Sequence, residues 1–576
     1  MMRRKLAGLA VCAVGILMLS VGAAGADDRL LLEMKARLDK LEKQNEDLRK
    51  QLQEIGGGGP YRPDKSIDDD KKKEQDKVEK LIDNYLKEKD KKKKEEETKK
   101  ETEGYEVGKQ LDFKGKWQNN QLWFETEDKA FRLHVGGRTQ IDAVAVHAPQ
   151  KMLVPTKEQG IGEFDNAVNF RRARLQVEGT LWDTLDFNAE YDFSNTARIV
   201  PAGSKISPEG QIAGTEGTSA DRNATINTPV PTDLWVQYHS VPFLGNIRIG
   251  NQKEWVSMEH INSSRYLDFM ERSLAFDAFV ENGNNGFIPG ISVWRSMLDD
   301  NLLVAAGIYW PNFRDVFGWD VGDGESLVSA RIAGTPIYED KGRYMVHLGL
   351  GYMHSTRDDG IIRFRARPLV RNGPAVLHNV VAQIQGDLQN YNLLVPEFMM
   401  NYGPFTLAAE YYAAWAYQAP GVAFGQVGRQ SSSKDLPSGG RGTLFYSGGY
   451  IEAGYFLTGE SRTYDRTLKV MTRQQLYENA FLVDGEEGAL FGRGAWQILA
   501  RYEFLDLNSE GVNGGVLNGT TVGVNWFLNP NAKIQVNYTL LYRDITQYKD
   551  GQVAAQGNTI RDGLIQGLGT RFAFDF

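Results

Sequence analysis

A two-residue alternation constrains this chain most, and it recurs in segments of about ten residues from about Val107 to Phe576. The clearest segments, in each of which one face is apolar and the other polar or charged, are 131–143, 172–181, 185–194 and 532–543. Alternate residues of a β-strand face opposite sides, and about 9–11 residues cross a bilayer as a strand. The pattern predicts a transmembrane antiparallel β-barrel. A soluble sandwich is the alternative, but burial against a second sheet needs no such uniform spans.

The connections between these segments fall into two classes. Tight turns are expected at 182–184 and 528–531, whereas 195–232, 355–390 and 418–442 read as long polar loops. Short turns at one end and long loops at the other are typical of outer-membrane barrels. The length of 107–576 predicts an all-β barrel of about 16 strands.

The last six residues repeat the alternation on a small scale. Phe572, Phe574 and Phe576 share one face, and Arg571 and Asp575 share the other. Aromatic side chains are enriched where barrel strands meet the membrane interface. We therefore expect a closing strand with its phenylalanines toward lipid.

The N-terminus has the form of a secretory signal over residues 1–26. A basic start (Arg3, Arg4) precedes an apolar run over 6–21 and a small-residue site at 24–26. An uncleaved membrane anchor is the alternative. The single cysteine, Cys12, lies within the signal, so the mature protein is expected to have neither disulfides nor thiol chemistry. After residue 26 no apolar stretch approaches the ~20 residues of a transmembrane helix.

Residues 27–55 carry an unbroken heptad pattern. One seam position holds Leu31, Leu38, Asn45 and Leu52, and the other holds Met34, Leu41, Leu48 and Ile55. Apolar a and d positions predict a coiled coil, and a single Asn in the seam fixes its register. A lone amphipathic helix packed on a domain is the alternative. The number of strands in the coiled coil is left open.

A Gly/Pro break and a charged linker follow over 56–106, before the predicted barrel of 107–576. Of the 40 residues in 64–103, 29 are charged, with 14 Lys against 15 Asp and Glu. Such a balance indicates a solvated spacer and argues against nucleic acid as a partner.

Arginines recur on the polar faces of the predicted strands, which would line the lumen of a barrel. They are Arg132, Arg138, Arg172, Arg174, Arg248, Arg331 and Arg501. Inward guanidiniums favour anions and suit phosphate oxygens, even though the chain carries a net charge of −8. The alternative is that facing carboxylates neutralise them. The candidates for that role are Asp142, Glu178, Glu190, Asp192 and Glu503.

Enzyme motifs do not support a catalytic role. The seven histidines are scattered, and neither H-E-x-x-H nor G-x-S-x-G occurs. We therefore predict that the protein is not an enzyme and uses no cofactor or metal.

Several motifs resemble, in order along about 110–576, the phosphate-selective porins of the O and P type. They are 170–175 (Phe-Arg-Arg-Ala-Arg-Leu), 190–194 (Glu-Tyr-Asp-Phe-Ser), 263–266 (Ser-Ser-Arg-Tyr), 269–274 (Phe-Met-Glu-Arg-Ser-Leu), 455–462 (Tyr-Phe-Leu-Thr-Gly-Glu-Ser-Arg) and 524–531 (Val-Asn-Trp-Phe-Leu-Asn-Pro-Asn). The resemblance implies a homotrimer of 16-stranded barrels, each narrowed by a loop folded into its pore. The N-terminal coiled coil is an addition to that pattern.

Carried over from this family, the anion pathway and constriction comprise ten residues of this chain. These are Lys129, Arg138, Arg171, Arg172, Arg174, Asp192, His260, Ser263, Ser264 and Arg272. One position departs from the family, because the inward loop commonly offers a lysine shortly before the serine pair. Here 257–262 reads Ser-Met-Glu-His-Ile-Asn, so a neutral His260 beside Glu259 would weaken a central phosphate site.

The resulting hypothesis is an outer-membrane porin for passive diffusion of small anions, including phosphate. A general, weakly selective porin is one alternative. Another is a structural anchor that tethers the outer membrane to peptidoglycan through residues 27–103, with the N-terminal segment in the periplasm. The expected partners are the outer-membrane bilayer, small anions and two further copies of the chain.

Overall fold

The structure is a computed structural model. It describes residues 113–118, 120–149, 166–199, 226–281, 286–311, 313–315, 318–319, 325–357, 361–367, 380–385, 389–417, 424–426, 429–430, 443–485, 488–509, 512–544 and 562–576. The predicted signal, coiled coil and charged linker lie outside these residues, as does most of the predicted loops 195–232 and 418–442. No helix of the described part of the chain is long and apolar enough to cross a membrane.

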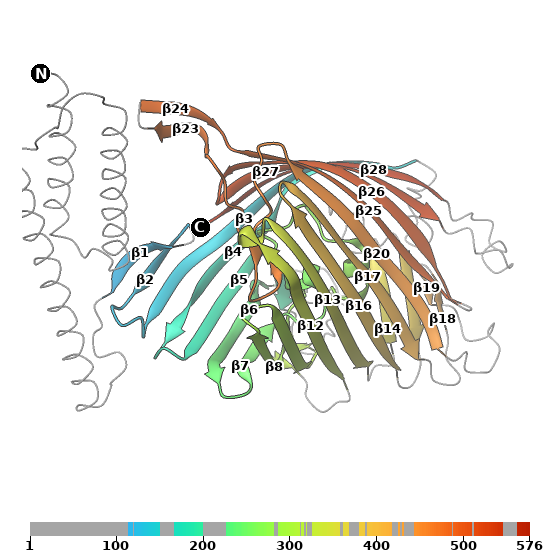
Figure 1. Cartoon of the computed structure of the whole chain (residues 1–576). Coiled ribbons are helices and arrows are strands. Elements are labelled where there is room, and N and C mark those ends of the chain that lie inside the picture. The colour runs from blue at the N-terminus through green and yellow to red at the C-terminus, as the bar shows by residue number, and fades with distance from the viewer. Residues whose placement is uncertain are drawn as a thin grey trace, which may run out of the picture. The chain divides into compact units, whose positions relative to one another are not determined.

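Sixteen antiparallel strands close into a barrel (Figure 1). In order around the wall they are β3 (Arg132–His147), β4 (Ala167–Leu181), β5 (Leu185–Ile199), β6 (Ile226–Val241), β7 (Gly245–Gln252), β8 (Ile288–Met297), β9 (Leu302–Tyr309), β12 (Ser326–Glu339), β13 (Tyr344–Arg357), β16 (Gln389–Tyr402), β17 (Phe405–Tyr417), β20 (Thr443–Phe456), β25 (Ala495–Ser509), β26 (Val512–Asn529), β27 (Ala532–Asp544) and β28 (Gly563–Asp575). The predicted fold class and strand number are confirmed.

The barrel closes where β28 pairs with β3, from Gln566 opposite His147 to Asp575 opposite Arg138. Along β28 the alternation is as predicted: Arg571 is fully buried, whereas Phe572, Phe574 and Phe576 are 41–45% exposed. An apolar row on the outside and a polar row on the inside are what a lipid-embedded barrel requires.

The two ends of the barrel differ as the sequence predicts. Tight turns at 182–184, 242–244, 403–404 and 530–531 define the short-turn end, which in outer-membrane barrels is periplasmic. Two elements extend that end: a hairpin of β1 (Lys114–Gln118) and β2 (Gln121–Glu125), paired to the start of β3, and the connection 457–494 between β20 and β25. The latter is an exception to the short-turn rule that the sequence did not reveal.

Short elements fill the connections. At the short-turn end they are the single-turn η3 (Asp340–Gly342) and, within 457–494, β21 (Tyr464–Asp465), β22 (Val470–Met471), β23 (Ala480–Gly485) and β24 (Gly488–Arg493). At the other end they are β10 (Phe313–Asp315), β11 (Gly318–Trp319), β14 (Ile361–Ala366), β15 (Val380–Gln385), β18 (Phe424–Gln426) and β19 (Arg429–Gln430). The predicted polar loop 355–390 therefore contains a hairpin, β14–β15.

The described residues of the connection between β7 and β8, 253–281 and 286–287, fold into the barrel and are here called the inward loop. It contains two short helices, α4 (Met258–Ile261) and α5 (Leu274–Phe279), and both are almost wholly buried. Ser257 and Ser273 cap them by accepting hydrogen bonds from the main-chain N–H groups of His260 and Phe276. Serine is a favoured N-cap residue because its hydroxyl satisfies an amide that lacks a helical partner.

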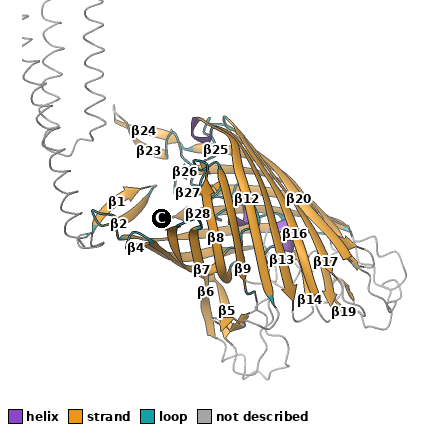
Figure 2. Cartoon of the chain, turned by 60° about the horizontal axis from the view of Figure 1, so that its bottom comes forward, coloured by secondary structure: helices purple, strands orange, loops and turns teal. Residues whose placement is uncertain are grey.

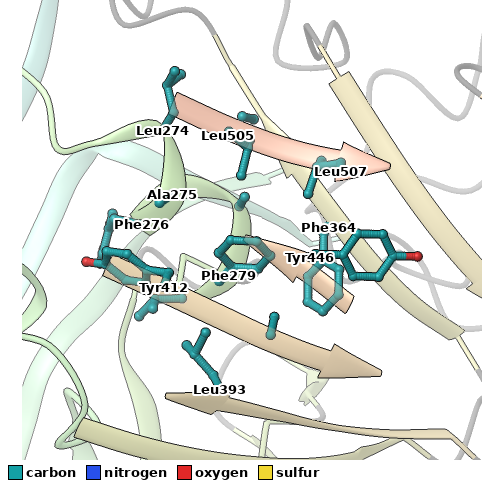
Figure 3. Packing of buried hydrophobic residues seen from close by; sticks show 14 of the residues in the cluster. Leu274, Ala275, Phe276, Phe279, Phe364, Leu393, Tyr412, Tyr446, Leu505 and Leu507 are labelled. Carbon is teal, nitrogen blue, oxygen red and sulfur yellow. The ribbon is translucent and has the colours of Figure 1, made fainter. Parts of the chain in front are cut away.

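The inward loop supports an apolar core inside the barrel (Figure 3). Phe276 and Phe279 of α5 pack with Phe364 of β14 and with lumen-facing Tyr412 and Tyr446. Further wall members are Tyr391, Leu393, Val395, Leu505, Leu507, Leu517, Leu541 and Ile565. These come from β16 and from β25–β28, so protein rather than water fills the lumen beside that side of the wall.

Candidate functional site

Guanidiniums are concentrated on the lumen face of β3 and β4, beside the inward loop. Arg138 of β3 lies opposite Arg174 of β4, and Gln140 lies opposite Arg172. Arg138, Arg172 and Arg174 are each at most 6% exposed. Strand alternation places these residues on one face, and cross-strand pairing then brings them together.

A β-bulge adds one more arginine to this face. Arg172 pairs with Gln140 and Phe170 pairs with Ile141, which leaves Arg171 without an opposite residue. An extra residue in one strand locally resets the alternation. Consequently Arg171 and Arg172 both face the lumen, although they are consecutive, and Phe170 stays outside with 61% exposure. The four arginines 138, 171, 172 and 174 form what we call the basic wall.

Carboxylates bind three members of the basic wall. Glu190 of β5 accepts hydrogen bonds from both Arg138 and Arg174, and Asp192 accepts one from Arg174 Nε at 2.8 Å. Arg171 donates to both carboxylate oxygens of Glu271 in the inward loop, at 2.7 and 3.0 Å. Such charge-assisted, forked hydrogen bonds fix the guanidiniums in place.

Arg172 is different, because its Nη1 donates to the neutral side-chain oxygen of Gln140 at 2.7 Å. Among the described residues, no carboxylate lies within salt-bridge distance of Arg172. One positive charge of the basic wall is therefore not offset by direct contact.

Serines of the inward loop complete this face. Arg138 Nη1 donates to Ser264 Oγ at 2.7 Å and to Ser263 Oγ at 3.3 Å. The Gln140 amide donates to the Ser264 carbonyl at 3.1 Å. The serine pair thus attaches the inward loop to β3.

On its other side, the inward loop is attached to the wall formed by β17 and β25. Glu410 accepts hydrogen bonds from the N–H groups of Met258 and Glu259, and Glu503 accepts one from Leu274 N–H. Each carboxylate lies at the start of a helix, where free amides and the helix dipole favour negative charge. The loop is therefore held from two sides of the lumen.

Two further cations lie on the inward loop itself. Lys253 Nζ donates to the carbonyls of His260 and Asn262 at 2.7 and 2.9 Å, and Arg272 donates to the carbonyls of Glu259 and Asn262 at 2.8 and 2.7 Å. Carbonyls at a helix C-terminus attract positive charge. Lys253 and Arg174 also approach the same ring, Phe287, at 5.6 and 5.7 Å.

The pKa of Lys253 reflects its burial and the other cations near it. Burial, followed by the charge of Arg272, lowers the pKa of Lys253 well below its usual 10.5, and Arg138 and Arg174 act in the same direction. Like charges disfavour a further positive charge. Among the described residues, no carboxylate lies within salt-bridge distance of Lys253.

The sequence profile of the family described as phosphate-selective porin O and P matches residues 133–566. The chain belongs to this family. An uncharacterised protein of Caulobacter vibrioides is 26% identical to this porin over 460 residues, which cover 79% of this chain and 75% of the relative.

Solved structures similar to this porin include an anion-selective porin from Comamonas acidovorans, at 11% identity and a TM-score of 0.41, which covers 77% of this chain and 100% of its own. The trimer form of OmpT from Vibrio cholerae gives 11% identity and a TM-score of 0.38, with 78% and 100% coverage. The fold and family are those of an outer-membrane channel.

The structure brings most predicted site residues of this porin together. The basic wall, Asp192, Ser263 and Ser264 are joined by the contacts above, and Arg272 joins them through the inward loop. Lys129 is an exception: it lies exposed in the turn before β3, where its N–H donates to the Thr126 carbonyl, and not among these residues.

His260 lies inside the inward loop rather than at an open basic site. It is 1% exposed in α4, and its Nε2 is 2.9 Å from a Glu254 carboxylate oxygen. Burial lowers the pKa of His260 below 6.5, so the imidazole is neutral at pH 7. A neutral His260 adds no positive charge to the inward loop, as the sequence analysis expects.

Sequence reasoning missed Lys253, although it is the lysine of the inward loop. A lysine was expected only just before the serine pair, whereas Lys253 directly follows β7. Its link to α4 arises because the chain doubles back, so that residue 253 meets the carbonyls of 260 and 262. Only the position of a lysine at a strand end could have drawn attention to it.

Carboxylates also contact lumen arginines elsewhere on the wall, as the alternative interpretation of these arginines requires. Arg331 donates to both oxygens of Glu397, and Arg501 contacts Glu259 and Glu503 at 3.4 and 3.5 Å. Glu178 instead accepts a hydrogen bond from Asn188.

Among the described residues, no cluster of three or more His, Cys, Asp or Glu side chains is arranged to hold a metal.

Proposed function

We propose that this porin passes small anions, phosphate among them, along the basic wall beside the inward loop. Arg172 and Lys253 carry the proposal, because no carboxylate in the described part of the chain lies within salt-bridge distance of either. Positive groups that line a water-filled constriction with low-dielectric walls attract anions and repel cations. The paired arginines serve mainly to position the loop.

The same pairing supports a second candidate, a weakly selective porin. Glu190, Asp192 and Glu271 offset much of the positive charge of the basic wall, which weakens its discrimination between anions and cations. We rank this second because Lys253 lies on the loop near enough to Arg272, Arg138 and Arg174 for their charges to lower its pKa.

A planar-bilayer reversal potential in a KCl gradient tests the proposal. We expect anion preference in the wild type and a smaller preference in Arg172→Gln and Lys253→Gln. Lys129→Gln, whose side chain is exposed outside the cluster, is the matched control and should leave the potential unchanged. Cation preference in the wild type would contradict the proposal, and absence of conductance would favour the structural anchor.

Phosphate is tested separately by adding it to a chloride-conducting channel. Block of the chloride current at low phosphate concentration, relieved in Arg172→Gln, would support a phosphate site. If block requires phosphate at a concentration as high as that of chloride, the protein is a general anion channel without a specific phosphate site.

We also propose that the porin is a homotrimer whose residues 27–103 form a periplasmic stalk that contacts the cell wall. The family resemblance supports the trimer, and the heptads of 27–55 support the stalk. Analytical ultracentrifugation of the detergent-solubilised full chain tests the first. For the second, deletion of 27–55 should abolish retention on peptidoglycan while leaving conductance intact.

A further inference from the structure

Two tryptophans attach the β23–β24 hairpin to the lipid side of the barrel. Trp496 of β25 and Trp526 of β26 are cross-strand neighbours, and their rings stack at 4.9 Å with an interplanar angle of 17°. Both indole N–H groups donate to the carbonyl of Arg493, the last residue of β24, at 3.1 and 2.8 Å. The base of the hairpin is therefore fixed to the outer face of the wall.

Two phenylalanines at that base are open to the surroundings. Phe481 of β23 lies edge-on to Trp526 at 5.5 Å and to Phe491 of β24 at 6.3 Å. Phe481 is nevertheless 51% exposed and Phe491 80% exposed. Apolar area left in water costs about 25 cal/mol per Å², and contiguous apolar surface on a protein marks a contact site.

Register places this base at the level of the membrane interface. Trp496 pairs with Trp526, Trp526 with Ile534, and Ile534 with Phe572, so the four lie in one row across β25–β28. The row adjoins Phe574 and Phe576 on the same outer face. Rows of aromatic side chains at both ends of the outer face mark the lipid interface of such barrels.

The hairpin also extends beyond the wall. β23 and β24 project from the same end of the barrel as β1 and β2 in two views (Figures 1 and 2). A segment that leaves the wall at interface level, with aromatic side chains outward, meets lipid headgroups before it meets open water.

We propose that the β23–β24 hairpin is an interfacial arm, which lies on the periplasmic leaflet and inserts Phe481 and Phe491 at the boundary between phospholipid headgroups and acyl chains. Its continuity with the aromatic row of the barrel selects a phospholipid surface as the partner. The arm enlarges the footprint of the porin in that leaflet without adding a strand to the barrel.

Site-directed quenching tests the arm in the full chain, since Cys12 is its only cysteine. In a Cys12→Ser background, Phe491→Cys is labelled with an environment-sensitive fluorophore and reconstituted in phosphatidylcholine vesicles. Some vesicles carry lipids brominated near the headgroup, and others carry lipids brominated near the bilayer centre. We expect strong fluorescence loss with the shallow bromines and much weaker loss with the deep ones.

Two matched positions calibrate the result. Val522, on the outer face of β26 and 50% exposed, reports full contact with acyl chains. Lys341, exposed in a turn at the short-turn end, reports water. A label at 491 that is as insensitive as one at 341 would overturn the proposal. So would cross-linking of Phe491→Cys between two copies in place of quenching, because the partner would then be a second chain.

Discussion

At the scale of the residue, the effect of each arginine in this lumen depends on its own contacts and not on the number of arginines. Arg138 and Arg174 share one carboxylate, Glu190, whereas Arg172 donates to an amide oxygen and contacts no carboxylate of the described residues. A buried ion pair contributes little net field, but loss of one partner leaves an uncompensated charge. Arginines that look equivalent along β3 and β4 therefore have different tasks.

Arg172→Gln is expected to lower anion preference with little loss of stability. Removal of one charge beside the pathway changes the energy of a passing anion by about 1 kcal/mol after screening, or roughly fivefold. Reversal potentials and unfolding midpoints of the same preparation check both parts.

Arg174→Gln provides the contrast, because Arg174 donates to both Glu190 and Asp192. Its loss removes one cation from two buried carboxylates. We expect it to destabilise the barrel by about 3–5 kcal/mol. Equal stability loss in the two variants would contradict the division of tasks drawn here.

Anion preference is expected to fall as pH rises through the lowered pKa of Lys253. Lys253 is charged below its pKa, and because that pKa is lowered, the charge disappears at a lower pH than for an ordinary lysine. Lys253→Gln should remove this step from the pH profile of the reversal potential. Burial lowers the pKa of Lys469 to about 8, so this lysine also loses its charge at a lower pH than usual. Lys469→Gln is therefore the control, and it should retain the step.

At the scale of the element, the inward loop and the β14–β15 hairpin act as one packed unit. Arg367, just after β14, donates to the Asp277 carboxylate of α5, with its shortest contact at 2.6 Å. Phe364 packs edge-on against Phe279 at 5.1 Å and Tyr391 at 5.3 Å. Close packing of this kind resists small displacements, which makes the constriction a fixed feature.

Phe364→Ala tests that packing. Truncation of a buried phenylalanine costs about 3–5 kcal/mol, and here the loss falls on the contact between hairpin and loop. We expect larger and noisier single-channel conductance together with a lower unfolding midpoint. Phe445→Ala, on the outer face of β20 with 41% exposure, is the control and should leave conductance unchanged.

The wall could be predicted from sequence, whereas the contents of the lumen could not. Ile534, Val536 and Tyr538 face outward as the alternation requires, because lipid accepts only apolar side chains there. Inside, Leu505 and Leu507 continue the polar face that carries Arg501 and Glu503. Nothing in the period-two pattern reveals that α5 and β14 cover them, since those contacts join segments far apart in the chain.

The candidate site shows the same division. Arg138, Arg172 and Arg174 were found because strand parity alone places them inward. Lys253 was missed, and Lys129 lies apart from the other predicted residues, because their positions depend on how a loop and a turn fold.

At the scale of the whole molecule, closure of the barrel joins the first and last strands of the wall through charge as well as main-chain pairing. Arg571 of β28 donates to both oxygens of Asp142 of β3, at 2.6 and 2.7 Å, and to Glu271 of the inward loop at 2.8 Å. One guanidinium thus connects the seam of the barrel to its constriction.

Arg571→Ala should therefore weaken the whole barrel. We expect a loss of about 3–5 kcal/mol, because Asp142 stays buried without its partner. The temperature at which the compact form unfolds on semi-native gels measures the effect. Arg493→Ala removes an exposed pair with Glu478 and should leave the unfolding temperature nearly unchanged, because exposed ion pairs contribute little to stability. Similar shifts in both variants would argue against a role of the seam.

The bulge at Arg171 makes the length of β4, and not only its composition, a determinant of the constriction. Each of the other β4 residues from 167 to 180 lies opposite one residue of β3. A chain that lacks residue 171 would therefore pair in unbroken register and keep its wall. Glu271 would nevertheless lose one of its two guanidiniums. Loss of a single codon at this point would therefore leave an intact barrel with a different charge beside its pore, a change that no substitution elsewhere in β4 reproduces.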